Sequence, residues 1–146
     1  MSEELRVFVY GTLKPGEYYH AHYCEGRIVA CEPAIAPGKL YDLPVGYPAM
    51  TAEAGTVWGY VLTLQNASVL ARLDELEDYQ SDRPAEQNEY NRQRIAIQRP
   101  DGVSLGQVWG YIMSVDRVQH FGGVVVSSGN WSGTRAIASP SKPLPY

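Results

Sequence analysis

The sequence predicts one α+β domain in which strands predominate. Its 146 residues fall within the size of a single domain. β-Branched and aromatic residues gather in several short runs, and only one segment has the apolar repeat of an amphipathic helix. Because no stretch rich in Gly or Ser divides the chain, residues 1–146 are expected to form one unit.

The first elements are expected to be short strands joined by turns. Residues 5–10 form an apolar run that predicts a strand, which leads into a loop over residues 11–16. Residues 17–24 have weak periodicity, which indicates an irregular or briefly helical segment. Residues 27–36 predict a strand that ends at a Pro-Gly pair, and residues 39–43 predict a short strand that ends at a proline.

Two similar strands follow. Residues 57–64 begin Val-Trp-Gly-Tyr-Val-Leu, and Val-Trp-Gly-Tyr-Ile-Met returns at residues 108–113. Nothing else repeats at that spacing, so the pattern indicates two like strands rather than a repeat architecture. A glycine inside a strand has no side chain to pack, and we expect Gly59 and Gly110 to mark a bend or a close backbone approach.

The rest of the second half is expected to hold one helix, one more strand and loops. The helix spans about residues 67–77 and is followed by a polar stretch over residues 78–89. Residues 90–98 predict a strand, which ends at the turn 99–102. Beyond residue 116 the pattern weakens and indicates loops and an extended tail.

The helix brings one acid in among its apolar residues. Asn66 or Ser68 can cap the N-terminus. At about 100° per residue, Glu77 falls within the apolar stripe and Asp74 on its edge. An inward carboxylate is costly to bury and is therefore a candidate general acid or base. The alternative is that the helix frays before Glu77, which lets the side chain reach water.

Composition excludes several partners. Twelve Lys and Arg against 16 Asp and Glu give a net charge of −4, so no basic surface is expected for nucleic acid. No apolar run approaches the roughly 18–20 residues needed to span a bilayer, and the N-terminus lacks the features of a signal peptide. We therefore expect a cytoplasmic protein that binds neither nucleic acid nor membrane. Eleven tyrosines against two phenylalanines point to a polar pocket within an apolar wall.

Other motifs are weak. Gly11 and Gly16 have P-loop spacing, but Glu17 stands where a P-loop has lysine, so nucleotide binding is not expected. A backbone amide cradle for another anion or a carbonyl stays open. Ser128 has no nucleophile motif around it, so the sequence does not suggest covalent catalysis.

Histidines and cysteines give no clear metal motif. His20, His22 and Cys24 alternate and would share one face of an extended strand, but they offer at most three ligands, and simple packing is the alternative. We expect no metal and no cofactor. Cys24 and Cys31 are expected to be small buried residues.

Three segments together resemble the gamma-glutamylcyclotransferase-like family. Their order and spacing match the family along about residues 5 to 115, and the resemblance does not extend beyond that range. The segments are Val-Tyr-Gly-Thr-Leu-Lys-Pro-Gly at 9–16, Gly-Lys-Leu-Tyr-Asp-Leu at 38–43 with Tyr-Pro-Ala at 47–49, and Leu-Asp-Glu-Leu-Glu-Asp-Tyr at 73–79; Tyr-Asn-Arg at 90–92 and Trp-Gly-Tyr at 109–111 continue the match.

The resemblance implies a strand-dominated mixed sheet curled into a partly closed barrel with a few helices. It also implies an enzyme that cyclises the gamma-glutamyl group of a small amide to 5-oxoproline and releases an amine or amino acid, without metal or cofactor. The family's substrate loop corresponds to Tyr10, Gly11, Thr12 and Leu13, and its catalytic glutamate corresponds to Glu77. The helical wheel selects the same acid independently.

Three more residues are candidates for the site. Tyr111 is a candidate to bind substrate, and Asp74 and Tyr79 are candidates to orient Glu77 or the substrate. A non-enzymatic ligand-binding module and a purely structural role for Glu77 are the alternatives. The loop together with the inward acid favours catalysis, because a binder of an anionic ligand would prefer Arg or Lys to a buried carboxylate. The leaving amine and the oligomeric state are not encoded in these patterns.

Overall fold

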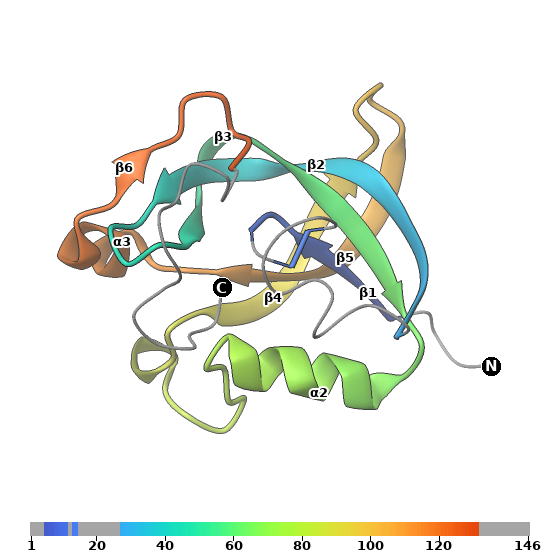
Figure 1. Ribbon diagram of the computed structural model, residues 1–146, viewed down its shortest axis with the longest axis horizontal. Helices are drawn as coiled ribbons and strands as arrows, with labels where there is room; N and C mark the ends of the chain where they lie inside the picture. Colours follow the sequence, from blue (N-terminus) through green and yellow to red (C-terminus); the bar gives the residue numbers. More distant parts are fainter. Residues whose placement is uncertain (1–4, 12, 15–26, 132–146) are drawn as a thin grey trace.

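Six strands and two helices make up the described part of the protein. The computed structural model describes residues 5–11, 13–14 and 27–131 (Figure 1). The strands are β1 (Leu5–Val9), β2 (Ile28–Asp42), β3 (Pro48–Leu64), β4 (Asn91–Gln98), β5 (Ser104–Ile112) and β6 (Val124–Val125). The helices are α2 (Ala67–Leu76) and α3 (Val115–Phe121), with a 3₁₀ turn η1 at Ala85–Gln87.

The strands form one mixed sheet that curls back on itself. Its order is β3-β1-β5-β4-β2-β6, and β2 also pairs with β3. The β1–β5 pair is parallel, whereas the other neighbours are antiparallel. Between β2 and β4 only Ile35 and Gln98 are in register, so the ring stays open there and is not a true barrel. The expected α+β class with a partly closed, strand-dominated sheet is thereby confirmed.

The core fills the ring and the face of the sheet that α2 covers. Val7, Phe8 and Val9 of β1 have no exposed surface because β1 lies between β3 and β5. The helix α2 runs along the underside of the strands in Figure 1. It contributes the buried face that its apolar repeat predicts: Val69, Leu70, Leu73 and Leu76.

Strands β2 and β3 are longer than the sequence predicts. The expected break at Pro37-Gly38 is a bulge, where the register shifts and Gly38 adopts φ +156° while β2 continues. Strand β3 begins at Pro48 rather than residue 57. Its first half is rich in small residues with little strand preference, and pairing with the far end of β2 holds it extended.

The region beyond residue 116 is not only loops. Helix α3 is capped by Ser114, whose hydroxyl accepts from the backbone N–H of Arg117, and it ends at Gly122 with φ +78°. Strand β6 then pairs with the end of β2. The helix is seven residues long, too short for its periodicity to be visible in the sequence.

The close backbone approach expected at the mid-strand glycines is present at Gly59, whereas Gly110 makes room for a side chain. A Cβ on Gly59 would overlap the carbonyl oxygen of Val9 and lie 2.9 Å from Cζ of Phe8. A Cβ on Gly110 would lie 2.6 Å from Cδ1 of Ile95. The expectation of a buried Cys31 is wrong, because its side chain is exposed on β2.

Candidate active site

Glu77 lies inside the protein at the end of α2. Its backbone N–H donates to the carbonyl of Leu73 at 2.9 Å, and its side chain is 0% exposed. The other end of the helix is held by Asn66, whose side chain accepts from the N–H of Ser68. The helix therefore does not fray before Glu77, and the carboxylate points inward as the helical wheel predicts.

The turn that follows Glu77 is tightly fixed. Asp78 adopts a left-handed conformation, φ +58°, which is uncommon for a residue other than glycine. The N–H of Tyr79 donates to the carbonyl of Asp74 at 2.9 Å, which closes the helix. Arg83 donates to the carbonyl of Asp78 at 2.7 Å and to its carboxylate at 3.2 Å. These bonds fix the backbone immediately after the candidate acid.

Four buried tyrosines gather near Glu77. Burial raises the pKa of Tyr47, Tyr90 and Tyr111, and the Glu77 charge raises each of them further. All four hydroxyls donate: Tyr10 to the carbonyl of Tyr111 at 2.8 Å, Tyr47 to Glu89 at 2.5 Å, Tyr90 to the carbonyl of Pro48 at 2.6 Å, and Tyr111 to Asp74 at 2.7 Å. Phenolic groups thus gather within the apolar core, as the tyrosine-rich composition suggests, and the Glu77 charge acts on three of them.

The acceptor of the Tyr111 hydrogen bond, Asp74, also forms an ion pair with Arg92. Asp74 accepts from Tyr111 through Oδ1 and from Nη1 of Arg92 through Oδ2 at 2.8 Å. Burial raises the pKa of Asp74, and the contacts with Tyr111 and Arg92 oppose that rise. The Arg92 guanidinium also stacks on the rings of Tyr79 and Trp109, at 5.3 and 4.6 Å from their centroids.

The loop after β1 also meets Tyr111, through the hydroxyl of Tyr10. Tyr10 and Leu13 are fully buried, and the N–H of Lys14 donates to the carbonyl of Gly11 at 3.0 Å. The Lys14 ammonium is nearly buried and donates to the Trp131 carbonyl and, at 3.1 Å, to the side chain of Asn130. Thr12 lies outside the described residues.

The structure therefore joins most of the predicted site. The Tyr10 hydroxyl donates to the carbonyl of Tyr111, the Tyr111 hydroxyl donates to Asp74, and the Glu77 charge raises the pKa of Tyr111. The Tyr79 ring contacts this network through the Arg92 guanidinium that stacks on it, and the Tyr79 backbone N–H donates to the carbonyl of Asp74. Sequence reasoning assigned no role to Tyr47, Tyr90 or Arg92; the abundance of tyrosine was the available signal for the first two.

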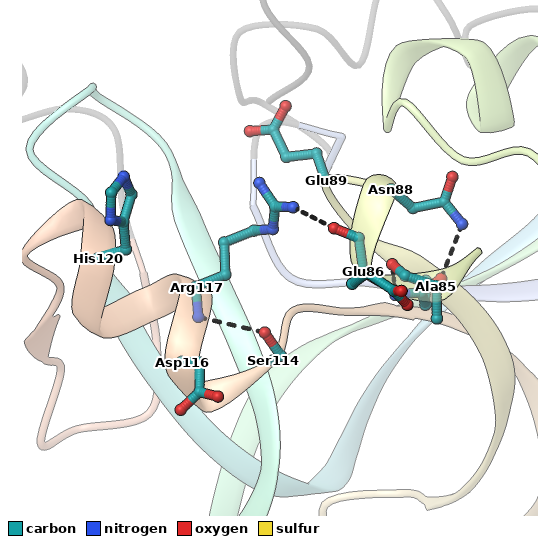
Figure 2. Close-up of a pocket in the computed structure, with 9 residues that line it drawn as sticks. Ala85, Glu86, Asn88, Glu89, Ser114, Asp116, Arg117 and His120 are labelled. Carbon is teal, nitrogen blue, oxygen red and sulfur yellow. Dashed lines mark hydrogen bonds between the residues drawn. The ribbon is translucent and has the colours of Figure 1, made fainter. Parts of the chain in front are cut away.

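A polar cleft lies beside the cluster of buried tyrosines, between η1 and the start of α3 (Figure 2). Its volume is about 640 Å³, and Arg117 crosses it to donate to the carbonyl of Glu86 at 2.8 Å. Glu89 lines the cleft and accepts the Tyr47 hydroxyl, so one wall of the cleft borders the tyrosine cluster. The lining residues are Ala85, Glu86, Asn88, Glu89, Asn91, Ser114, Asp116, Arg117 and His120.

Within the described ranges, no group of three or more His, Cys, Asp or Glu side chains is arranged to hold a metal ion. The alternating His20, His22 and Cys24 lie outside those ranges. No helix in the described part of the chain is long and apolar enough to cross a membrane.

Comparison with known proteins identifies the family. The sequence model of the family "Gamma-glutamyl cyclotransferase, AIG2-like" matches residues 7–133. The chain belongs to this family. A cyclotransferase relative from Niallia circulans, named gamma-L-glutamyl-butirosin B gamma-glutamyl cyclotransferase, is 33% identical over 111 residues, which are 75% of this chain and 67% of that protein.

Solved structures agree on the fold of this gamma-glutamyl cyclotransferase family member. An AIG2-like protein from Mus musculus has a TM-score of 0.69 at 18% identity, with 92% of each chain covered. YkqA from Bacillus subtilis has a TM-score of 0.61 at 23% identity; the match covers 88% of this chain but only 40% of YkqA. At these identities the likeness concerns the fold alone.

Proposed function

We propose that this protein cyclises the gamma-glutamyl group of a small amide to 5-oxoproline and releases the amine, with Glu77 as general acid and base. The observation that carries the proposal is the fully buried Glu77 carboxylate at a fixed helix end, whose charge raises the pKa of the buried Tyr47 and Tyr111. Family membership and the name of the Niallia circulans relative support the reaction type and point to amides of amines as the first compounds to test.

The substrate carries its own nucleophile. The α-amino nitrogen of a gamma-glutamyl amide attacks the side-chain amide carbon within the same molecule, which gives a five-membered ring and benefits from the high effective concentration of intramolecular reactions. At neutral pH the amine is an ammonium ion, so it must lose a proton before it attacks. Glu77 is placed to accept that proton.

The same carboxyl group completes the reaction. Attack forms the ring C–N bond and a tetrahedral oxyanion, which backbone N–H groups of the loop after β1 would stabilise. The original C–N bond then breaks, and Glu77 returns its proton to the departing nitrogen. After ring closure the ring nitrogen still carries one proton more than the lactam product, and it loses that proton. The released amine takes it up and leaves as an ammonium ion, and Glu77 is again a carboxylate. No oxidant, metal or activated co-substrate enters this balance.

The test is release of 5-oxoproline from a panel of gamma-glutamyl amines and gamma-glutamyl amino acids. Compounds whose α-amino group is acetylated serve as matched controls, because they keep the amide but lose the nucleophile. We expect 5-oxoproline and free amine in equal amounts from at least one member of the panel and none from its acetylated counterpart. A folded protein that releases 5-oxoproline from no member would overturn the proposal.

A further inference from the structure

The hydrogen bond between Tyr111 and Asp74 has a fixed direction. A tyrosine hydroxyl has one proton to donate, and an ionised carboxylate can only accept. Tyr111 gives its proton to Oδ1 of Asp74 at 2.7 Å. Any further hydrogen bond to the Tyr111 oxygen must therefore come from a donor.

Arg92 favours the ionised, accepting form of Asp74. Its Nη1 lies 2.8 Å from Oδ2 of Asp74, and this contact opposes the effect of burial on the pKa of the carboxyl group. The guanidinium is held by the rings of Tyr79 and Trp109. Its Nε is buried with no acceptor within the described part of the chain, so the group is not placed to satisfy all of its own hydrogen bonds.

The Tyr111 hydroxyl meets α2 on the side that carries two carboxyl groups. Asp74 and Glu77 are three residues apart, which makes their side chains neighbours on a helix. The charges of both raise the pKa of Tyr111, whose ring is fully buried. Because the Tyr111 hydroxyl is bonded to Asp74, and Glu77 neighbours Asp74 on the helix, the lone pairs of the Tyr111 oxygen lie on the same side of α2 as the Glu77 carboxylate. Two acceptors side by side fit a ligand group with several N–H donors, and an ammonium has three.

We propose that Arg92 and Asp74 are positioning residues that hold the Tyr111 oxygen as a hydrogen-bond acceptor for the amino group of the ligand, beside Glu77. The inference rests on the proposed function, which puts the α-amino group of a gamma-glutamyl compound there. It also gives a reason for product release: after cyclisation this nitrogen is a neutral lactam with a single N–H, so it can no longer bond both acceptors.

The test compares two inert ligands that differ only in the amino group. In both, a sulfone (C–SO2–C) replaces the whole amide group of an alkyl gamma-glutamyl amide, so neither can cyclise; one keeps the α-amino group and the other has hydrogen in its place. Titration calorimetry gives the ratio of their dissociation constants. We expect the parent protein to prefer the amine-bearing ligand by roughly tenfold to a hundredfold, the usual worth of a hydrogen bond to a charged group.

Three variants locate the source of that preference. Arg92→Met keeps an unbranched stem between the two rings and should reduce the ratio about fivefold or more. Arg92→Lys keeps a cation for Asp74 and should restore most of the ratio. Arg94→Met is the matched control, because Arg94 also stacks on Trp109, at 4.5 Å, whereas the ion pair of Asp74 is with Arg92.

The ratio separates this inference from the proposed function. A folded Arg92→Met protein with the parental ratio would overturn the positioning role, and so would an equal loss in Arg94→Met. A parent protein that binds both ligands equally would overturn amine recognition even if it releases 5-oxoproline. If the parent shows the ratio and Arg92→Met loses it, the inference stands, whether or not the 5-oxoproline assay supports catalysis.

Discussion

Replacing Glu77 by glutamine tests the centre of the proposed chemistry. The amide has nearly the volume of the carboxyl group, so it fits a side-chain site that is 0% exposed. It cannot accept the proton of the substrate ammonium. General acid–base catalysis contributes about 10²–10⁴-fold, so turnover should fall by that factor, equivalent to roughly 3–5 kcal/mol in the barrier.

Folding should change much less than turnover. The substitution removes a buried charge, which lowers a desolvation cost, and leaves an amide whose hydrogen bonds must be met, so we expect a change in unfolding free energy within about 2 kcal/mol. Turnover is followed by 5-oxoproline release, and folding by thermal melting. Glu75→Gln is the matched control, because Glu75 is an exposed residue of the same helix and should keep the parental rate. A folded Glu77→Gln protein with the parental rate would refute the assignment of the base.

Four further outcomes are expected. Arg92→Met removes two ring contacts at every pH and also the ion pair that opposes the effect of burial on the pKa of Asp74. The ion-pair part of the loss in unfolding free energy should be absent below the unfolded pKa of about 3.9 and grow to about 1–2 kcal/mol by neutral pH, measured by urea denaturation across pH. A uniform loss at every pH would contradict this account. Gly59→Ala should lower unfolding free energy by about 1–3 kcal/mol, because its Cβ would overlap the carbonyl of Val9; an unchanged melting curve would contradict the packing. Gly11→Val should weaken binding of the amine-bearing sulfone ligand in a folded protein, and parental affinity would remove the loop from the site. Dialysis against a strong chelator should leave turnover unchanged, whereas a loss that zinc restores would reveal a metal requirement.

Local patterns were enough to locate much of the fold and the candidate acid. The strand before Tyr10 and the helix before Glu77 are long and regular enough to be read from residue type alone. The inward position of Glu77 follows from the same helical period that buries the leucines. The left-handed Asp78 could not be read this way, since aspartate rarely adopts that conformation and Arg83 holds it from another turn.

The missed features depend on contacts between distant segments. The first half of β3 has weak strand preference and is extended because β2 pairs with it. Arg92 belongs to a segment that matches the family, but its ion pair with Asp74 joins β4 to α2 across 18 positions. Tyr47 likewise meets Glu89 over a separation of 42 residues. No sequence window short enough to show periodicity contains either pair.

The place of β1 in the sheet has a consequence for synthesis of the protein. Its neighbours are β3 and β5, and the Tyr10–Tyr111 hydrogen bond spans 101 residues. At about 5–20 residues per second, a ribosome needs roughly 5–20 s to make the intervening chain. The first strand leaves the ribosome with both edges unpaired and acquires its last partner only when nearly all of the described chain has been made. The cluster of four buried tyrosines is therefore among the last parts to assemble, and a nascent chain that ends before β5 lacks Tyr111, which we propose as part of the substrate site.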